Sequence, residues 1–194
     1  MKTLKYYFLL TTSLLILSSC DTNDDGFYNV VYLNATDLVT VETEPSYNVG
    51  DFIFVTADFS RYQQEVGQDE LLDIYKTTGN ATRFIFPYYL ERKKADGTWE
   101  VVPIPTNTLQ IIKGSAISGP YVSGSCVFNS ADDTYEYNVG VPLTQAGDYR
   151  LGFGYDTSSN RVELVSNSTG LNLYMDIMST TNYNSPPYYL FTVN

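Results

Sequence analysis

The 194-residue chain contains no histidine. Imidazole is a common general base in enzymes and a common zinc ligand, so its absence excludes Ser-His-Asp and Cys-His catalytic groups and any zinc site that needs histidine. The chain also lacks a glycine-rich phosphate loop, a Gly-x-Ser-x-Gly turn and a His-Glu-x-x-His motif. We therefore predict that the protein is not an enzyme and that it uses no cofactor and no metal ion.

Carboxylates leave one catalytic alternative open. Glycosidases use two acidic side chains from distant segments that face each other across a cleft, and a single sequence does not reveal such a pair. The adjacent acids Asp69-Glu70 and Asp132-Asp133 lie in turn-like contexts. Neighbouring residues of a strand point to opposite faces, so these pairs are expected to be solvated turn residues.

Basic residues are scarce: 11 lysines and arginines stand against 22 aspartates and glutamates, which gives a net charge of −11. Nucleic-acid binding needs clustered basic side chains that displace counterions, so no nucleic-acid partner is expected. The cluster Arg92-Lys93-Lys94 lies between Glu91 and Asp96 and is expected to be the solvated end of a hairpin.

Cysteine occurs only at positions 20 and 126. The neighbours of Cys126 in GSCVFN are typical of a small buried strand residue, which is the common environment of a free thiol. No disulfide can form within the chain if Cys20 carries a lipid.

Long apolar runs are missing apart from YYFLLTTSLLIL at residues 6–17. A helix of this length spans about 18 Å, well short of the ~30 Å hydrocarbon core of a membrane. Lys2 and Lys5 precede the run and small residues follow it, which is the layout of a secretory signal. Leu17-Ser18-Ser19-Cys20 resembles the bacterial lipobox. The resemblance implies that residues 1–19 are removed and that Cys20 carries a lipid anchor.

The run Asp21-Thr22-Asn23-Asp24-Asp25-Gly26 allows two interpretations. It matches the first half of a calcium loop, but the twelfth position, where a bidentate glutamate belongs, is Tyr32. It also fits an acidic, solvated and flexible tether, which we predict for residues 20–26. This tether resembles the acidic export tag of surface lipoproteins of Bacteroidota. The resemblance implies a lipid-anchored position in the outer membrane, facing the cell exterior.

The rest of the chain has no convincing apolar stripe at helical spacing and many short stretches with strand alternation. Residues 69–76 fit a helix and a strand about equally well. Lys94-Ala95-Asp96-Gly97 predicts a hairpin turn, and Pro87, which has no N–H to donate, predicts a bulge or an edge position. Strands are predicted at 27–33, 51–59, 82–93, 98–102, 148–155, 161–165, 171–178 and 188–193.

The number and spacing of these strands predict an all-β protein with an antiparallel β-sandwich. LTQAGDYRLGF at 143–153 resembles immunoglobulin-like domains, in which a Gly-Asp-Tyr loop leads into a core strand, although the antibody cysteine pair is absent. The resemblance implies an immunoglobulin-like sandwich, which we place in a single domain at 27–194. The whole pattern is similar to small surface-exposed lipoproteins of Bacteroidota, which implies a location but no mechanism.

Tyrosine is abundant, with 18 residues, and Trp99 is the single tryptophan. Any one tyrosine can simply occupy a half-buried strand face, but the set predicts an exposed aromatic patch, because tyrosine suits both protein contacts and stacking on sugars. Tyrosines in or near predicted loops or beside polar residues are Tyr28, Tyr32, Tyr62, Tyr121, Tyr135, Tyr137, Tyr183, Tyr188 and Tyr189. The candidate binding residues are Tyr62, Trp99, Tyr121, Tyr183, Tyr188 and Tyr189.

Two functions stay open at this point. The first is a non-catalytic binding or accessory subunit that docks onto an outer-membrane protein assembly. The alternative is a glycan-binding module of a surface polysaccharide uptake system. A sugar site needs coplanar aromatic rings along a groove with polar groups at its rim, whereas a protein site needs a flatter patch of several hundred Å2.

Overall fold

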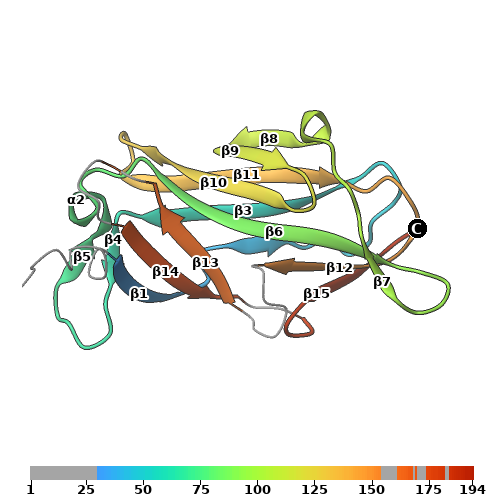
Figure 1. Ribbon diagram of the computed structural model, residues 1–194, viewed down its shortest axis with the longest axis horizontal. Coiled ribbons are helices and arrows are strands. Elements are labelled where there is room, and N and C mark those ends of the chain that lie inside the picture. The colour runs from blue at the N-terminus through green and yellow to red at the C-terminus, as the bar shows by residue number, and fades with distance from the viewer. Residues whose placement is uncertain (1–29, 154–160, 168, 170–173, 182–183) are drawn as a thin grey trace, which may run out of the picture. The chain divides into compact units, whose positions relative to one another are not determined.

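Strands account for most of the regular structure in the computed structural model, which describes residues 30–153, 161–167, 169, 174–181 and 184–194 (Figure 1). The expectation of an all-β protein is confirmed. Among these residues, no helix is long and apolar enough to cross a membrane. The signal segment, Cys20, the acidic tether, Tyr28 and Tyr183 lie outside the described residues.

The elements are short and follow one another closely along the chain. The strands are β1 (Val30–Thr36), β2 (Thr40–Glu42), β3 (Phe52–Ser60), β4 (Tyr62–Gln64), β5 (Leu71–Asp73), β6 (Arg83–Lys93), β7 (Trp99–Val101), β8 (Gln110–Lys113), β9 (Ser115–Ser118), β10 (Val122–Asn129), β11 (Thr134–Pro142), β12 (Gly147–Phe153), β13 (Arg161–Ser166), β14 (Tyr174–Thr180) and β15 (Tyr189–Val193). The helical turns are α2 (Ile74–Thr77) and η1 (Thr106–Thr108).

Most of the strands belong to one 13-stranded sheet. Its main path runs β1-β14-β13-β6-β10-β11-β3-β2, and β12, β15, β7, β8 and β9 attach beside it. The ladders with a defined register are antiparallel. The small β4–β5 sheet lies with α2 near one end of β6, and β7 lies near the other end (Figure 1).

Strand β6 connects the parts of the large sheet. One of its edges pairs with β10 and then with β7. The other edge pairs with β13 at Phe84 and Ile85 and with β12 from Tyr88 onward. Pro87 lies between these two partners, where neither ladder needs an N–H donor. Pro87 is therefore at a local edge on this side, although it faces Ser123 of β10 on the other.

Strand alternation builds a core rich in aromatic rings. The largest fully buried side chains include Tyr88, Tyr135, Tyr137, Phe84, Phe86 and Phe153. The suggestion that Tyr135 and Tyr137 contribute to an exposed patch is therefore wrong. Both lie on the buried face of β11, together with Val139 and Val141.

The predicted local structure is largely confirmed. Residues 51–59 correspond to β3, a central strand between β11 and β2. The predicted hairpin is formed by β6 and β7, and its turn is closed by the Lys94 N–H, which donates to the Thr98 carbonyl. Residues 69–76 adopt both conformations in turn. Strand β5 ends at Asp73, whose carboxylate accepts a hydrogen bond from the Lys76 N–H and so caps α2.

Candidate binding face

Strands β7, β6, β12 and β15 lie side by side and carry a row of outward-facing residues. The register places Arg150 opposite Glu91 and Leu190, and it places Glu91 opposite Val101. Residues directly opposite each other in a ladder share a face. Since Leu151 is fully buried on the other face, the row with Arg150 points outward.

Arg150 packs against two aromatic rings on this outward face. Its guanidinium carbon lies 4.7 Å from the ring centre of Trp99 and 4.0 Å from that of Tyr188. Its Nε donates a hydrogen bond of 2.5 Å to Glu91 Oε2. Cation–π contacts of this kind contribute about 0.5–2 kcal/mol, depending on solvent exposure. The guanidinium is thus held in one place, and it orders both rings.

A glycine allows two tyrosines to lie close to the sheet beside this stack. A Cβ at Gly152 would be only 2.7 Å from the Tyr89 hydroxyl oxygen and 3.2 Å from Cδ1 of Tyr188. The Tyr89 hydroxyl is buried without a hydrogen bond of normal geometry. Burial, followed by the neighbouring Tyr188, raises the pKa of Tyr89, so its hydroxyl stays protonated.

A shallow hollow of about 280 Å³ lies beside Trp99. The Asp148 carboxylate, at its rim, accepts a hydrogen bond of 2.9 Å from Thr192 Oγ1. Lys93 Nζ lies 6.0 Å from the ring centre of Trp99. The hollow therefore combines apolar walls with charged groups of both signs. It is lined by Lys93, Trp99, Asp148, Tyr149, Leu190, Phe191 and Thr192.

The structure brings together two of the predicted binding residues, Trp99 and Tyr188. Tyr62 lies apart from them in β4, where its ring centre is 4.9 Å from the guanidinium carbon of Arg61. Tyr121 precedes β10 and is 39% exposed. Tyr189 is only 8% exposed and belongs to the core, so the prediction that it binds a partner is wrong.

Sequence reasoning does not single out Arg150, the residue that joins Trp99 and Tyr188. The available signal is its position in the alternation of residues 148–155, where it is a charged residue on the outward face. The alternation does not show which residues Arg150 contacts. Trp99 and Tyr188 come from segments far away in the sequence, and only the pairing of β12 with β6 and β15 brings them together.

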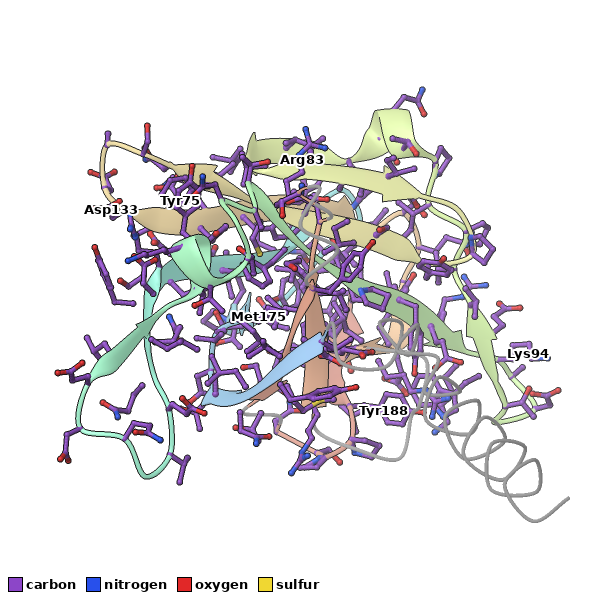
Figure 2. The ribbon with its side chains drawn as sticks, turned by 60° about the vertical axis from the view of Figure 1, so that its left-hand side comes forward. Tyr75, Arg83, Lys94, Asp133, Met175 and Tyr188 are labelled. Carbon is purple, nitrogen blue, oxygen red and sulfur yellow. The ribbon has the colours of Figure 1, made fainter. Side chains whose placement is uncertain are left out.

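Arg61 organises a different polar cluster, near α2. Its guanidinium donates to both carboxylate oxygens of Asp73, at 3.0 and 2.5 Å, and to Asp133 Oδ1 at 3.1 Å. Its guanidinium carbon also lies 5.2 Å from the ring centre of Tyr75, and Figure 2 shows Tyr75 and Asp133 close together in this region. These contacts fasten the start of β4 to β5 and to the β10–β11 turn. The positive charge of Arg61 is thus paired within the cluster, which is typical of a structural role.

Two carboxylates from separate strands also meet, namely Glu163 of β13 and Asp176 of β14. Desolvation, and then the neighbouring carboxylate Glu163, raise the pKa of Asp176 to about 7. Glycosidases place their two carboxyl groups on opposite sides of a cleft that holds the substrate, whereas Glu163 and Asp176 are diagonal neighbours on one face of two paired strands. In the described part of the chain, no group of three or more acidic or thiol side chains is placed to hold a metal ion.

Comparison with protein-family models, with curated proteins and with solved structures finds no match to this chain.

Proposed function

We propose that the protein is a non-catalytic, lipid-anchored binding subunit of the outer membrane that docks onto a partner protein there through its aromatic face. The aromatic face is defined as Trp99, Val101, Arg150, Tyr188 and Leu190. The observation that carries the proposal is the packing of Arg150 against the rings of Trp99 and Tyr188 on an outward-facing row of strands.

The composition of the aromatic face fits a protein interface. Tryptophan, tyrosine and arginine dominate the residues that contribute most to protein binding. Val101 and Leu190 are 47% and 39% exposed, so they offer apolar area that a partner can bury. The contacts of Arg150 with Glu91 and the two rings fix these side chains before binding, which lowers the entropy cost of association.

The proposed anchor and fold complete this interpretation. A lipid on Cys20, followed by the acidic tether, would keep the domain close to outer-membrane partners and raise its effective concentration there. We also propose that the sheet is an immunoglobulin-like β-sandwich, in which the strands beside the two edges of β6 enclose the aromatic core.

Cross-linking in intact cells tests the proposal. Wild-type protein is expected to cross-link to an outer-membrane protein, and Trp99→Ala and Tyr188→Ala are expected to reduce the yield at least tenfold. Tyr32→Ala is the matched control, since Tyr32 is 72% exposed and lies in β1, away from this face. Cys20→Ser should release the protein from membranes and abolish the cross-link. An unchanged cross-linking pattern for both variants, with folding intact, would contradict the proposal.

The second candidate is a glycan-binding module, and the hollow beside Trp99 favours it. A sugar ring could stack on Trp99 while Asp148 and Lys93 bind hydroxyl groups. The decisive result would be retention on a polysaccharide column that Trp99→Ala and Asp148→Ala abolish, together with no cross-linked membrane protein. That outcome would replace the first function with the second.

A further inference from the structure

Strands β4 and β5 form a two-stranded sheet that is not part of the large one. A two-stranded hairpin is at best marginally stable alone in water, so it needs support from its surroundings. Arg61, just before β4, supplies this support through its bonds to Asp73 and Asp133. Leu72, in the middle of β5, packs against the core. Residues 62–73, which we call the hairpin, are thus held at their base, and the loop between the strands extends away from the large sheet (Figure 1).

One face of the hairpin carries exposed apolar side chains. The register places Gln64 opposite Leu71, and Tyr62 lies two residues before Gln64, so all three share a face. Leu72 points to the other face, toward the core. Tyr62 is 43% exposed and Leu71 is 55% exposed, and the guanidinium of Arg61 holds the ring of Tyr62 in place. The face therefore offers ordered apolar area to a partner.

The apex of the hairpin is a tight turn with a valine at its second position. The N–H of Gln68 donates to the Glu65 carbonyl at 3.2 Å, and Gly67, at the third position, has a φ of +86°, as in a type II turn. The carboxamide nitrogen of Gln64 donates to the carbonyls of Glu65 and Gln68 and so braces the turn. Val66 is 86% exposed, more than any other large apolar side chain of the described residues. The turn itself does not require a valine, since its second position favours proline.

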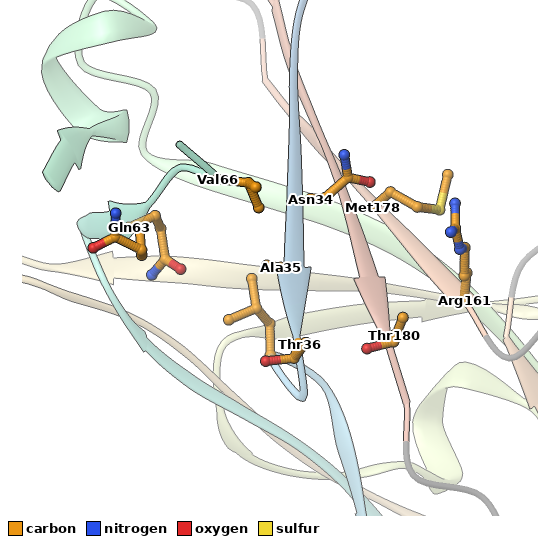
Figure 3. A pocket seen from close by; sticks show the side chains of 10 residues that line it. Asn34, Ala35, Thr36, Gln63, Val66, Arg161, Met178 and Thr180 are labelled. Atoms are coloured by element: carbon orange, nitrogen blue, oxygen red, sulfur yellow. The ribbon is translucent and has the colours of Figure 1, made fainter. Parts of the chain in front are cut away.

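The apex is also open on the side of β1. A hollow of about 530 Å³ touches Gln63 and Val66 of the hairpin and Asn34 of β1, and Figure 3 shows these residues around it. We define the hairpin strip as Tyr62, Val66 and Leu71. The hydrogen bonds within the turn and the contacts at the base fix the backbone of the strip before binding. A partner that buries the strip would therefore lose little entropy in ordering it.

The charges beside the strip all have one sign. Residues 62–72 contain Glu65, Asp69 and Glu70 and no basic residue. None of these three carboxylates forms an ion pair with another described residue. Charges at the rim of a docking surface speed association with a partner of opposite sign and disfavour partners of the same sign. The net charge of −11 acts in the same direction, so it attracts a basic partner and repels a second copy of this chain.

We propose that the hairpin strip docks onto a partner protein whose surface has an apolar depression rimmed by lysine or arginine side chains. Val66 enters the depression, and Tyr62 and Leu71 cover its edge. The carboxylates beside the strip pair with the basic rim. The hairpin and the aromatic face lie near opposite ends of β6, so this binding site does not depend on the proposed function (Figure 1).

Photo-cross-linking in outer-membrane preparations of cells that express the full chain tests the proposal. The photoreactive residue p-benzoylphenylalanine is placed at position 68, because the side chain of Gln68 makes no hydrogen bond with the described residues. The cross-linked segment of the partner should contain more lysine and arginine than aspartate and glutamate. The yield should fall steeply at about 1 M NaCl, where the Debye length is only about 3 Å.

Two sets of variants, made with the photoreactive residue in place, separate the strip from general effects. Val66→Ser should lower the cross-linking yield at least about tenfold, as expected for a central contact. Val49→Ser is its matched control, since Val49 is also exposed, at 52%, and lies outside the hairpin. Both variants should melt like the wild type, because neither side chain is buried. Trp99→Ala should leave this cross-link unchanged, whatever its effect on the aromatic face.

Neutralising the hairpin carboxylates tests the choice of a basic partner. The triple variant Glu65→Gln, Asp69→Asn and Glu70→Gln should lower the yield and remove most of its salt dependence. A control with the same change in net charge elsewhere should behave like the wild type. The control combines three exposed acids, with the substitutions Glu42→Gln, Glu44→Gln and Asp58→Asn.

Four results would overturn the assignment. The first is no cross-link to another protein, and the second is a cross-linked segment without an excess of basic residues. The third is an equal yield for wild type and Val66→Ser, or an equal loss of yield in the two triple variants. The fourth is a cross-link to a second copy of this chain, which would make that copy the occupant.

Discussion

The hydroxyl oxygens of Tyr88 and Tyr137 lie 2.8 Å apart in the core, and both side chains are buried. Removing one hydroxyl leaves the other buried without its partner, so Tyr88→Phe and Tyr137→Phe should each lower the free energy of unfolding by about 1–2 kcal/mol. In the double variant the free energy of unfolding should fall by clearly less than the sum of the two single decreases, because no buried hydroxyl is left without a partner. Urea unfolding of the four proteins checks this, and strictly additive costs would contradict it.

The same pair explains a glycine in β10, which lies next to β6. A Cβ at Gly124 would come within 2.9 Å of Cζ and 3.0 Å of the hydroxyl oxygen of Tyr137, and within 3.0 Å of Cζ of Phe86. Gly124→Ala should therefore destabilise the protein by about 1–3 kcal/mol through overpacking. Gly119→Ala is the matched control, since a Cβ there meets nothing within 4 Å. Equal thermal midpoints for the two variants would refute this account of Gly124.

The strands could be predicted from the sequence because alternation is a local property, and β3, β6 and β13 lie close to their predicted ranges. The burial of Tyr135 and Tyr137 could have been predicted as well. Tyr135, Tyr137, Val139 and Val141 form one apolar series at a spacing of two residues. The contacts of Arg150 could not be predicted, because they depend on the register between distant strands, which the alternation of one strand does not determine.

The carboxyl pair predicts how stability depends on pH. The pKa of Asp176 rises from its ordinary value of 3.8 to about 7, so the folded protein keeps a proton in this range that the unfolded chain releases. The free energy of unfolding should therefore fall as the pH rises from about 4 to 7. Asp176→Asn should flatten this part of the curve and stabilise the protein by about 1 kcal/mol at pH 8, after allowance for solvent screening.

Urea unfolding at a series of pH values measures this dependence. Glu42→Gln is a suitable control, because Glu42 is an exposed residue of β2, and its curve should follow the wild type. A wild-type free energy of unfolding that rises between pH 4 and 7, together with an identical curve for Asp176→Asn, would contradict the raised pKa of Asp176.

The Arg61 cluster predicts unequal effects for its two carboxylates. Asp73 binds Arg61 through both oxygens and also caps α2, whereas the side chain of Asp133 makes a single contact and is 49% exposed. Asp73→Ala should lower the free energy of unfolding by at least about 1 kcal/mol, the value of a lost helix cap. Asp133→Ala should lower it by clearly less. Arg61 and the Lys76 N–H lower the pKa of Asp73. The contribution of Asp73 to the free energy of unfolding is therefore complete above the ordinary carboxyl pKa. It is lost as the pH falls through the lowered pKa of the folded protein. Chemical denaturation at pH 7 and pH 3 checks both statements.

Thiol titration links the buried core to the proposed anchor. Cys126 is fully buried, as its sequence context predicts, and burial raises the pKa of its thiol, so Ellman's reagent should react with it only after unfolding. Protein purified from membranes should then show one thiol per chain in denaturant and none when native, because the proposed lipid would occupy the sulfur of Cys20. A Cys126→Ala variant from the same membranes should show none in either state, whereas Cys20→Ser should still show one in denaturant. Two thiols in denatured wild-type protein would mean that Cys20 is free, and the lipid anchor would have to be abandoned.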